Sequence, residues 1–232
     1  VSGGGKSFTQ GVNIAPRLSE HPKNPNNFPM ISYSDAEGQG DGKGEGYELK
    51  LALPVLLTSK VVIMNIRDGR IRKEQLLRLN VLIRTAKCLK SNQQDKTPFG
   101  HLHIVNRDID LEKVSEEDAR VKLMEEEDTE DLEGEQKEVA DSRNEIRYDI
   151  KKYFESVSVV TLPDPFHCEK QFDARVAKLR DKIMEQLETP KLFGGKEISG
   201  NTITTIVKLL VKELNDRKSD VHSFLNPPSM IT

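Results

Sequence analysis

Short β-branched segments alternate with longer amphipathic segments through most of this 232-residue chain. The β-branched segments are bounded by polar residues or proline, which predicts buried strands at 61–64, 102–105 and 157–162. Apolar residues at helical spacing predict helices near 76–89, 146–154, 175–187 and 203–214. Because parallel strands need a long crossover, usually a helix, this alternation predicts an α/β fold with a mainly parallel sheet flanked by helices.

Three short segments end or follow strand-like stretches: residues 35–38, 107–108 and 162–165. In open parallel sheets, ligands bind beyond the carboxyl ends of the strands. We therefore expect these three segments to meet at one edge of the sheet and to line a single ligand site.

The first of these segments, Asp35-Ala36-Glu37-Gly38, has the form D-x-x-G. An aspartate at the end of a strand can hold Mg²⁺ through water, and the glycine lets a backbone N–H approach a terminal phosphate closely. The glycine-rich stretch 40–46 would then form the mobile loop that a nucleotide-sensing switch needs. An ordinary turn at the end of a strand fits the same four residues, so this pattern alone leaves both interpretations open.

Charge is distributed unevenly along the chain. The formal net charge is -3, yet residues 112–141 contain fourteen acidic and four basic residues, a net charge of -10. This acidic segment has few apolar residues and no aromatic residue, so we expect a flexible, partly helical surface insertion. The functional alternative is an arm that docks a basic protein partner.

Composition excludes several classes of protein. Hydrophobic residues are 35% and charged residues 31%, and no apolar stretch approaches the length of a membrane span. No basic stripe interleaved with aromatic residues is present, so nucleic acid is not an expected partner. Two cysteines cannot form a disulfide framework, and we interpret them as core thiols of a cytoplasmic protein.

Two further candidates carry little functional weight. His101 and His103 share one face of a predicted strand, but no third metal ligand is near them, so we interpret them as partly exposed structural histidines. Residues 3–7 (Gly-Gly-Gly-Lys-Ser) contain part of a phosphate-loop pattern. They lack its first glycine and a preceding strand, and we do not interpret them as that loop.

Taken in order, the motifs of this chain resemble the GTPase domain of the guanylate-binding protein and atlastin branch of the dynamin superfamily. Residues 7–11 (S-F-T-Q-G) resemble the first switch, and residues 35–38 resemble the D-T-E-G second switch. Residues 106–108 (N-R-D) resemble the R-D base-reading motif, and residues 198–201 resemble a stretch near the end of the domain. The resemblance implies a P-loop GTPase type of fold, with residues 1–232 forming one partial domain.

The resemblance implies roles for five residues on the phosphate side of the site. Thr9 would ligate Mg²⁺ and sense the γ-phosphate, and Asp35 would hold the metal through water. Gly38 would donate its backbone N–H to the γ-phosphate. Ser7 and Glu37 would be catalytic residues that organise the attacking water. The implied cofactors are therefore GTP and Mg²⁺.

On the base side, the resemblance implies that Asp108 accepts hydrogen bonds from guanine and that Arg107 braces the base. Guanine presents two adjacent donors to such a carboxylate, whereas adenine would present an acceptor there. In the absence of a nucleotide site, Arg107 and Asp108 would form no more than a surface ion pair at the end of a strand.

The family's phosphate loop should lie upstream of Ser7, so we expect the chain to be a fragment that lacks it, together with the first strand and helix. Phosphate stabilisation is the main catalytic contribution in phosphoryl transfer, so residues 1–232 alone should neither bind GTP tightly nor hydrolyse it. Ala36 and Gln39 also depart from the usual second switch, where threonine and an apolar residue stand.

The sequence therefore predicts a large GTPase that, at full length, binds and hydrolyses GTP and forms a homodimer across its nucleotide face. A second hypothesis is a non-catalytic interaction module that keeps the fold and uses the acidic segment to dock a partner. The motifs leave membrane association open.

Overall fold

The computed structural model describes residues 12–15, 17–23, 30–36, 45–91, 99–193 and 196–215. Contacts between residues divide the chain into two compact units. The first unit contains residues 1–59, 84–97 and 189–232, and the second contains residues 60–83 and 98–188. The assignment of residues 1–232 to one domain therefore stays a prediction.

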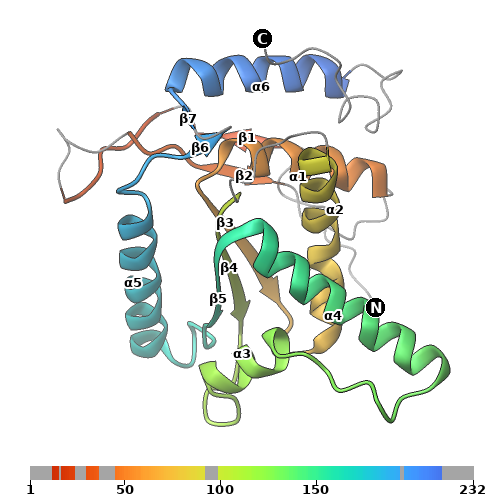
Figure 1. The fold of residues 1–232 in the computed structure, drawn as a ribbon. Helices are drawn as coiled ribbons and strands as arrows, with labels where there is room; N and C mark the ends of the chain where they lie inside the picture. Colours follow the sequence, from red (N-terminus) through yellow and green to blue (C-terminus); the bar gives the residue numbers. More distant parts are fainter. Residues whose placement is uncertain are drawn as a thin grey trace, which may run out of the picture. The chain divides into compact units, whose positions relative to one another are not determined.

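The second unit is built on a parallel sheet with the strand order β3-β4-β5 (Figure 1). The strands span Val61–Arg67, Phe99–Arg107 and Phe154–Thr161. The middle strand, β4, is buried along almost its whole length, as expected for a parallel strand that is covered on both faces. The three predicted strands and the α/β class are confirmed.

Helices cover this sheet. The helical elements of the second unit are η1 (Lys73–Leu79), the start of α2 (Asn80–Ser91), α3 (Glu116–Met124), α4 (Gly134–Tyr153) and α5 (Glu169–Gln186). Helices α3 and α4 both contact β5 and η1. Helix α5 joins the sheet through polar contacts, for example from Arg175 to the carbonyl oxygen of Thr161 (3.1 Å).

Two helices, α3 and the first part of α4, account for much of the acidic segment 112–141, so the segment is partly helical, as expected. Its flexibility stays a prediction. Helix α3 begins with a capping box, in which the Ser115 hydroxyl accepts from the Asp118 N–H and the Asp118 carboxylate accepts from the Ser115 N–H. The few apolar residues of the segment include four that are buried: Ala119, Leu123, Met124 and Ala140. The segment therefore has a buried side that a count of its charges does not reveal.

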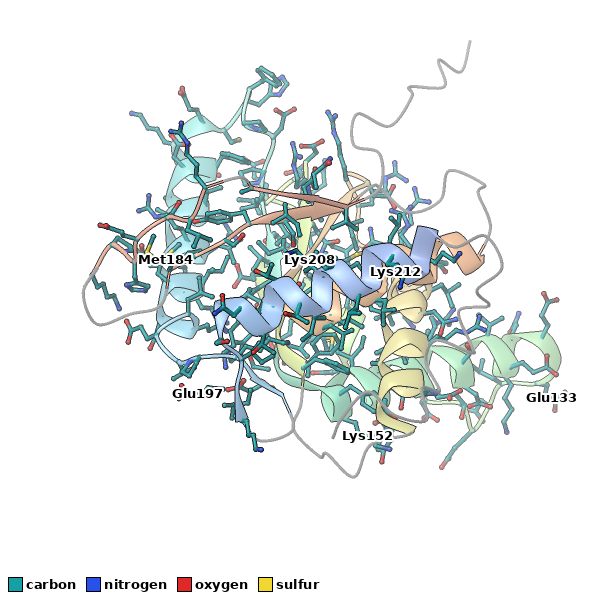
Figure 2. All side chains as sticks on the ribbon, turned by 90° about the horizontal axis from the view of Figure 1, so that it is seen from above. Glu133, Lys152, Met184, Glu197, Lys208 and Lys212 are labelled. Carbon is teal, nitrogen blue, oxygen red and sulfur yellow. The ribbon has the colours of Figure 1, made fainter. Side chains whose placement is uncertain are left out.

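The charges at the two ends of α4 suit a helix. Figure 2 labels Glu133, just before the N-terminal end of α4, and Lys152 in its last turn. A carboxylate near the N-terminal end and an ammonium near the C-terminal end both complement the helix dipole. The charges at its two ends thus stabilise a helix that begins and ends at these residues.

His101 and His103 are buried in the sheet, not partly exposed. The register of the strands places His103 beside Ser158, and His103 Nδ1 bonds the Ser158 hydroxyl. His103 Nε2 bonds Gln186 Oε1 (2.8 Å) from α5. Because the amide oxygen can only accept, Nε2 carries a proton, and in the neutral ring that burial favours Nδ1 accepts from the Ser158 hydroxyl. Burial lowers the pKa of His103 below its usual 6.5.

We expect the free energy of unfolding to fall as the pH drops below about 6.5. The unfolded His103 gains a proton near its ordinary pKa, whereas the buried ring resists protonation until the pH reaches its lower folded pKa. Urea unfolding at about pH 7.5 and about pH 5.5 measures the loss, and His103→Gln should reduce this pH dependence. An unchanged dependence in the variant would contradict the assignment.

The described residues of the first unit include two small antiparallel pairs of strands, the helices α1 and α6, and the later part of α2. Strand β1 (Val12–Ile14) pairs with β2 (Ser34–Ala36), and β6 (Leu192–Phe193) pairs with β7 (Lys196–Glu197). Helix α1 (Glu45–Thr58) includes the apolar stretch 51–57 and contacts α6 (Gly200–Asn215). None of the described helices is long and apolar enough to cross a membrane.

The side chain of Lys191 caps the C-terminal end of α1. Its ammonium donates to the carbonyl oxygens of Leu56 (3.1 Å) and Ser59 (2.7 Å). The last carbonyl groups of a helix lack partners within the helix, and a cation there also complements the dipole. This contact ties the segment before β6 to the end of a helix more than 130 residues earlier in the chain.

Candidate functional site

The carboxyl ends of the three parallel strands form the candidate site. In register, Arg67 at the end of β3 lies beside Arg107 at the end of β4. The backbones of β4 and β5 stay together past the sheet, because Leu162 N–H donates to Asn106 O (2.8 Å) and Ile109 N–H donates to Leu162 O (3.0 Å). The residues that follow β4 and β5 are thereby held side by side at this edge.

Asp108, the residue directly after β4, has an unusual backbone conformation. Its φ is +61°, and it is the only described residue other than glycine with a positive φ. Aspartate tolerates this left-handed conformation better than most residues, and such positions are concentrated at functional sites. The chain therefore turns sharply at this residue, whose carboxylate remains about one-fifth exposed.

Arg67 contacts the carboxylate of Asp108. The Arg67 Nε donates to Asp108 Oδ2 at 2.6 Å, and the arginine side chain is 74% exposed. The hydrogen bond to Asp108 is the main reason that the pKa of Arg67 lies above its ordinary value. Sequence reasoning missed Arg67, because the predicted strand ended before it and its partner depends on the register of β3 against β4.

The loop after β5 carries a third acidic group. The Asp164 carboxylate accepts from the backbone N–H of Phe166 (2.8 Å) and bonds His167 Nδ1 (3.0 Å). These contacts, the backbone N–H first, lower the pKa of Asp164 below its ordinary value. The charge of Asp164 also contributes to the raised pKa of Arg67. Asp108 is therefore the carboxylate that contacts Arg67 at this edge, and Asp164 contributes only a smaller charge effect.

The structure places three of the seven predicted site residues. Arg107 and Asp108 lie at the carboxyl end of β4, as expected. Asp35 lies in β2, where it is exposed and paired in register with Asn13 of β1. Asp35 and Asp108 belong to different compact units, so their meeting around one nucleotide stays a prediction. The other four lie outside the described residues: Ser7, Thr9, Glu37 and Gly38.

Among the described residues, no three His, Cys, Asp or Glu side chains gather as a metal site. The predicted magnesium site needs fewer protein ligands than this, because Mg²⁺ keeps several waters and takes one or two protein oxygens. The exposed carboxylate of Asp35 supplies the hard oxygen that such an ion prefers, so its chemistry fits the predicted role.

A parallel sheet flanked by helices, with charged residues at the carboxyl ends of its strands, is the architecture of an α/β domain and agrees with the P-loop GTPase type. Residues 1–191 match the family model described as guanylate-binding protein, N-terminal domain. The chain belongs to the guanylate-binding protein family, whose N-terminal domain is a large GTPase that binds GTP. No curated protein matches the chain.

Proposed function

We propose that the intact protein binds GTP with Mg²⁺ and hydrolyses it, with Asp108 reading the guanine base. The observation that carries this proposal is the place of Asp108 at the carboxyl end of the middle strand, in a left-handed turn. The carboxylate can accept the N1–H and the amino group of guanine together, whereas adenine would direct an acceptor toward it. Arg107 braces the base beside it.

The phosphate side of the proposed site involves residues of the first two motifs. Asp35 and Thr9 hold Mg²⁺, which supplies positive charge that stabilises the phosphate oxygens. Gly38 donates its N–H to the γ-phosphate, and Ser7 and Glu37 position water. The family membership and the exposed carboxylate of Asp35 support these roles. The intact protein dimerises across this nucleotide face in the cytoplasm.

Exchanging Asp108 for asparagine should lower the preference of the intact protein for GDP over ADP by on the order of 10- to 100-fold. Asparagine keeps the shape of the side chain but replaces one acceptor with a donor, which opposes the amino group of guanine. Titration of fluorescent GDP and ADP measures the two dissociation constants.

Asp110→Asn is the matched control, since Asp110 lies two residues away, is exposed and pairs with Lys113 (2.7 Å). The control should leave the preference unchanged. A preference that survives in Asp108→Asn would refute the role of Asp108 in base reading.

A second candidate function is a non-catalytic module that docks a basic partner on the acidic segment. One observation favours it: a hollow of about 760 Å³ lies between α3 and α4. The hollow is lined by three apolar side chains, those of Val121, Leu132 and Val139. It is also lined by Glu126 and Glu135, which form no ion pair with any described residue. The same titration discriminates the two functions, because this module would bind neither nucleotide.

A further inference from the structure

We propose that Arg67 sets the affinity of the guanine site by acting as a built-in competitor for the base. Its guanidinium occupies the carboxylate of Asp108 when no base is bound, and it has to leave that carboxylate before guanine can bind it fully. This inference rests on the proposed function, since it assumes that Asp108 reads guanine. It concerns a residue of β3 that lies outside the motifs of the sequence.

The competition follows from the chemistry of the two groups. A guanidinium presents N–H donors side by side in one plane, and it binds carboxylates through them. Guanine presents the same arrangement, an N1–H beside an amino group on one planar edge. Arg67 Nε already lies 2.6 Å from Asp108 Oδ2. The side chain thus holds an oxygen that the base would need.

Asp108 has no other described side-chain partner. Apart from Arg67, no described residue forms a hydrogen bond or an ion pair with its carboxylate. An exposed ion pair contributes little to the stability of a fold. The contact therefore affects whether the Asp108 carboxylate is available to a base more than it affects the stability of the sheet.

Arg67 can leave Asp108 at small cost. Its side chain is 74% exposed at the end of an edge strand of the described sheet, where Asp68 and Gly69 follow in a turn. Asp164 offers a second carboxylate whose charge already acts on Arg67. When guanine takes Asp108, the exposed guanidinium can turn into solvent. The exchange replaces one set of charge-assisted hydrogen bonds with another.

The test compares Arg67→Gln with the wild type in the intact protein, by titration of fluorescent GDP at about 0.05 M and about 0.5 M salt. Removing the competitor should tighten GDP binding by up to about five-fold at low salt, the range of an exposed ion pair. The gain should shrink at high salt, because salt weakens the Arg67–Asp108 pair in the wild type.

Two controls separate this effect from general loss of charge. Arg70→Gln removes the same charge from the same turn, and no described residue forms an ion pair with Arg70. It should not tighten GDP binding. In an Asp108→Asn background, Arg67→Gln should also give no gain, because the contested carboxylate is absent. A thermal melt of each variant verifies that it is folded.

The outcomes distinguish failure of the competitor role of Arg67 from failure of the proposed guanine site. If the wild type prefers GDP and Arg67→Gln gives equal or weaker binding, the competitor role is overturned while the guanine site stands. An equal gain in Arg70→Gln, or a gain that persists beside Asp108→Asn, overturns it as well. If the wild type binds GDP no better than ADP, the proposed function fails and the competitor role fails with it.

Discussion

Replacing Glu127 with glutamine lowers the free energy of unfolding by about 3–5 kcal/mol, the cost of removing one partner from a buried ion pair. Glu127 is 9% exposed and binds three cations. Arg143 holds both carboxylate oxygens (2.6 Å each), Arg147 bonds Oε1 (2.9 Å) and Lys73 bonds Oε2 (2.9 Å). Glutamine would leave their positive charges without a counter-charge.

Arg147 makes this loss severe. Its side chain is fully buried, so water cannot replace the carboxylate. Its remaining bonds go to neutral oxygens, on Leu123 (2.9 Å), Asn144 (2.7 Å) and the backbone of Lys122 (3.4 Å). An uncompensated charge in such a place costs far more than a lost surface ion pair. Glu127 lies in the loop between α3 and α4, and its ion pairs join this loop to η1 on one side and to α4 on the other. The variant therefore loosens three parts of the second unit at once.

Urea unfolding of both forms at neutral pH measures the effect. Glu126→Gln is the matched control, since its side chain is exposed and forms no ion pair with a described residue. It should change the free energy of unfolding by no more than about 0.5 kcal/mol. A loss below about 1 kcal/mol in Glu127→Gln would show that the cluster is not the stabilising feature that its geometry indicates.

The same cluster gives a signature in acid. Hydrogen bonds from Arg143, above all, lower the pKa of Glu127 from 4.5 to about 2. The carboxylate therefore contributes its full stabilisation above about pH 4.5, and this is lost as the pH falls through about 2. Glu127→Gln should lack this part of the acid dependence.

Glu127 also shows which feature of the acidic segment could not be predicted from its sequence. A charge count over 112–141 treats Glu127 as one of fourteen solvated acids. Two of its partners, Arg143 and Arg147, lie just beyond the segment on α4, and Lys73 lies on η1, 54 residues earlier. Which cations meet a carboxylate is decided by tertiary packing, and no local window of sequence contains that information.

The strands were predictable because each contains a short apolar stretch bounded by polar residues or proline, but their ends were not. β3 continues through Asn65 and Ile66 to Arg67, because backbone pairing with β4 extends it past the apolar stretch. That extension brings Arg67 beside Arg107 and within reach of Asp108. Asp108 itself was predictable, since its position after a strand is a local feature. The contact between Arg67 and Asp108 could be predicted only from the register of β3 against β4.

Replacing Gly100 with alanine lowers the free energy of unfolding by at least about 2 kcal/mol, the cost of forcing extra volume against a fixed backbone. A Cβ on Gly100 would lie 1.7 Å from the carbonyl oxygen of Lys60 and 2.6 Å from its carbonyl carbon. Real carbon and oxygen atoms cannot approach so closely, so one strand has to move. Glycine within a strand commonly marks such a close approach of two backbones.

The strand that has to move is held at this point. His101 N–H donates to the same Lys60 carbonyl (2.8 Å), and the pairing of Val61 with His101 begins there. A shift large enough to admit the methyl group breaks this bond and loosens the start of the β3–β4 ladder. Because β4 is the middle strand of the described sheet, the disturbance reaches both of its neighbours.

Gly200→Ala is the matched control, because a Cβ at Gly200, the first residue of α6, meets no atom within 4 Å. Alanine also favours a helix over glycine, so this variant should be as stable as the wild type or slightly more stable. Thermal and urea unfolding of both variants compare the same chemical change at a crowded and an open position. If Gly100→Ala unfolds with the wild-type midpoint, the tight contact between Gly100 and Lys60 cannot exist in the protein, and the register of β3 on β4 must differ at its start.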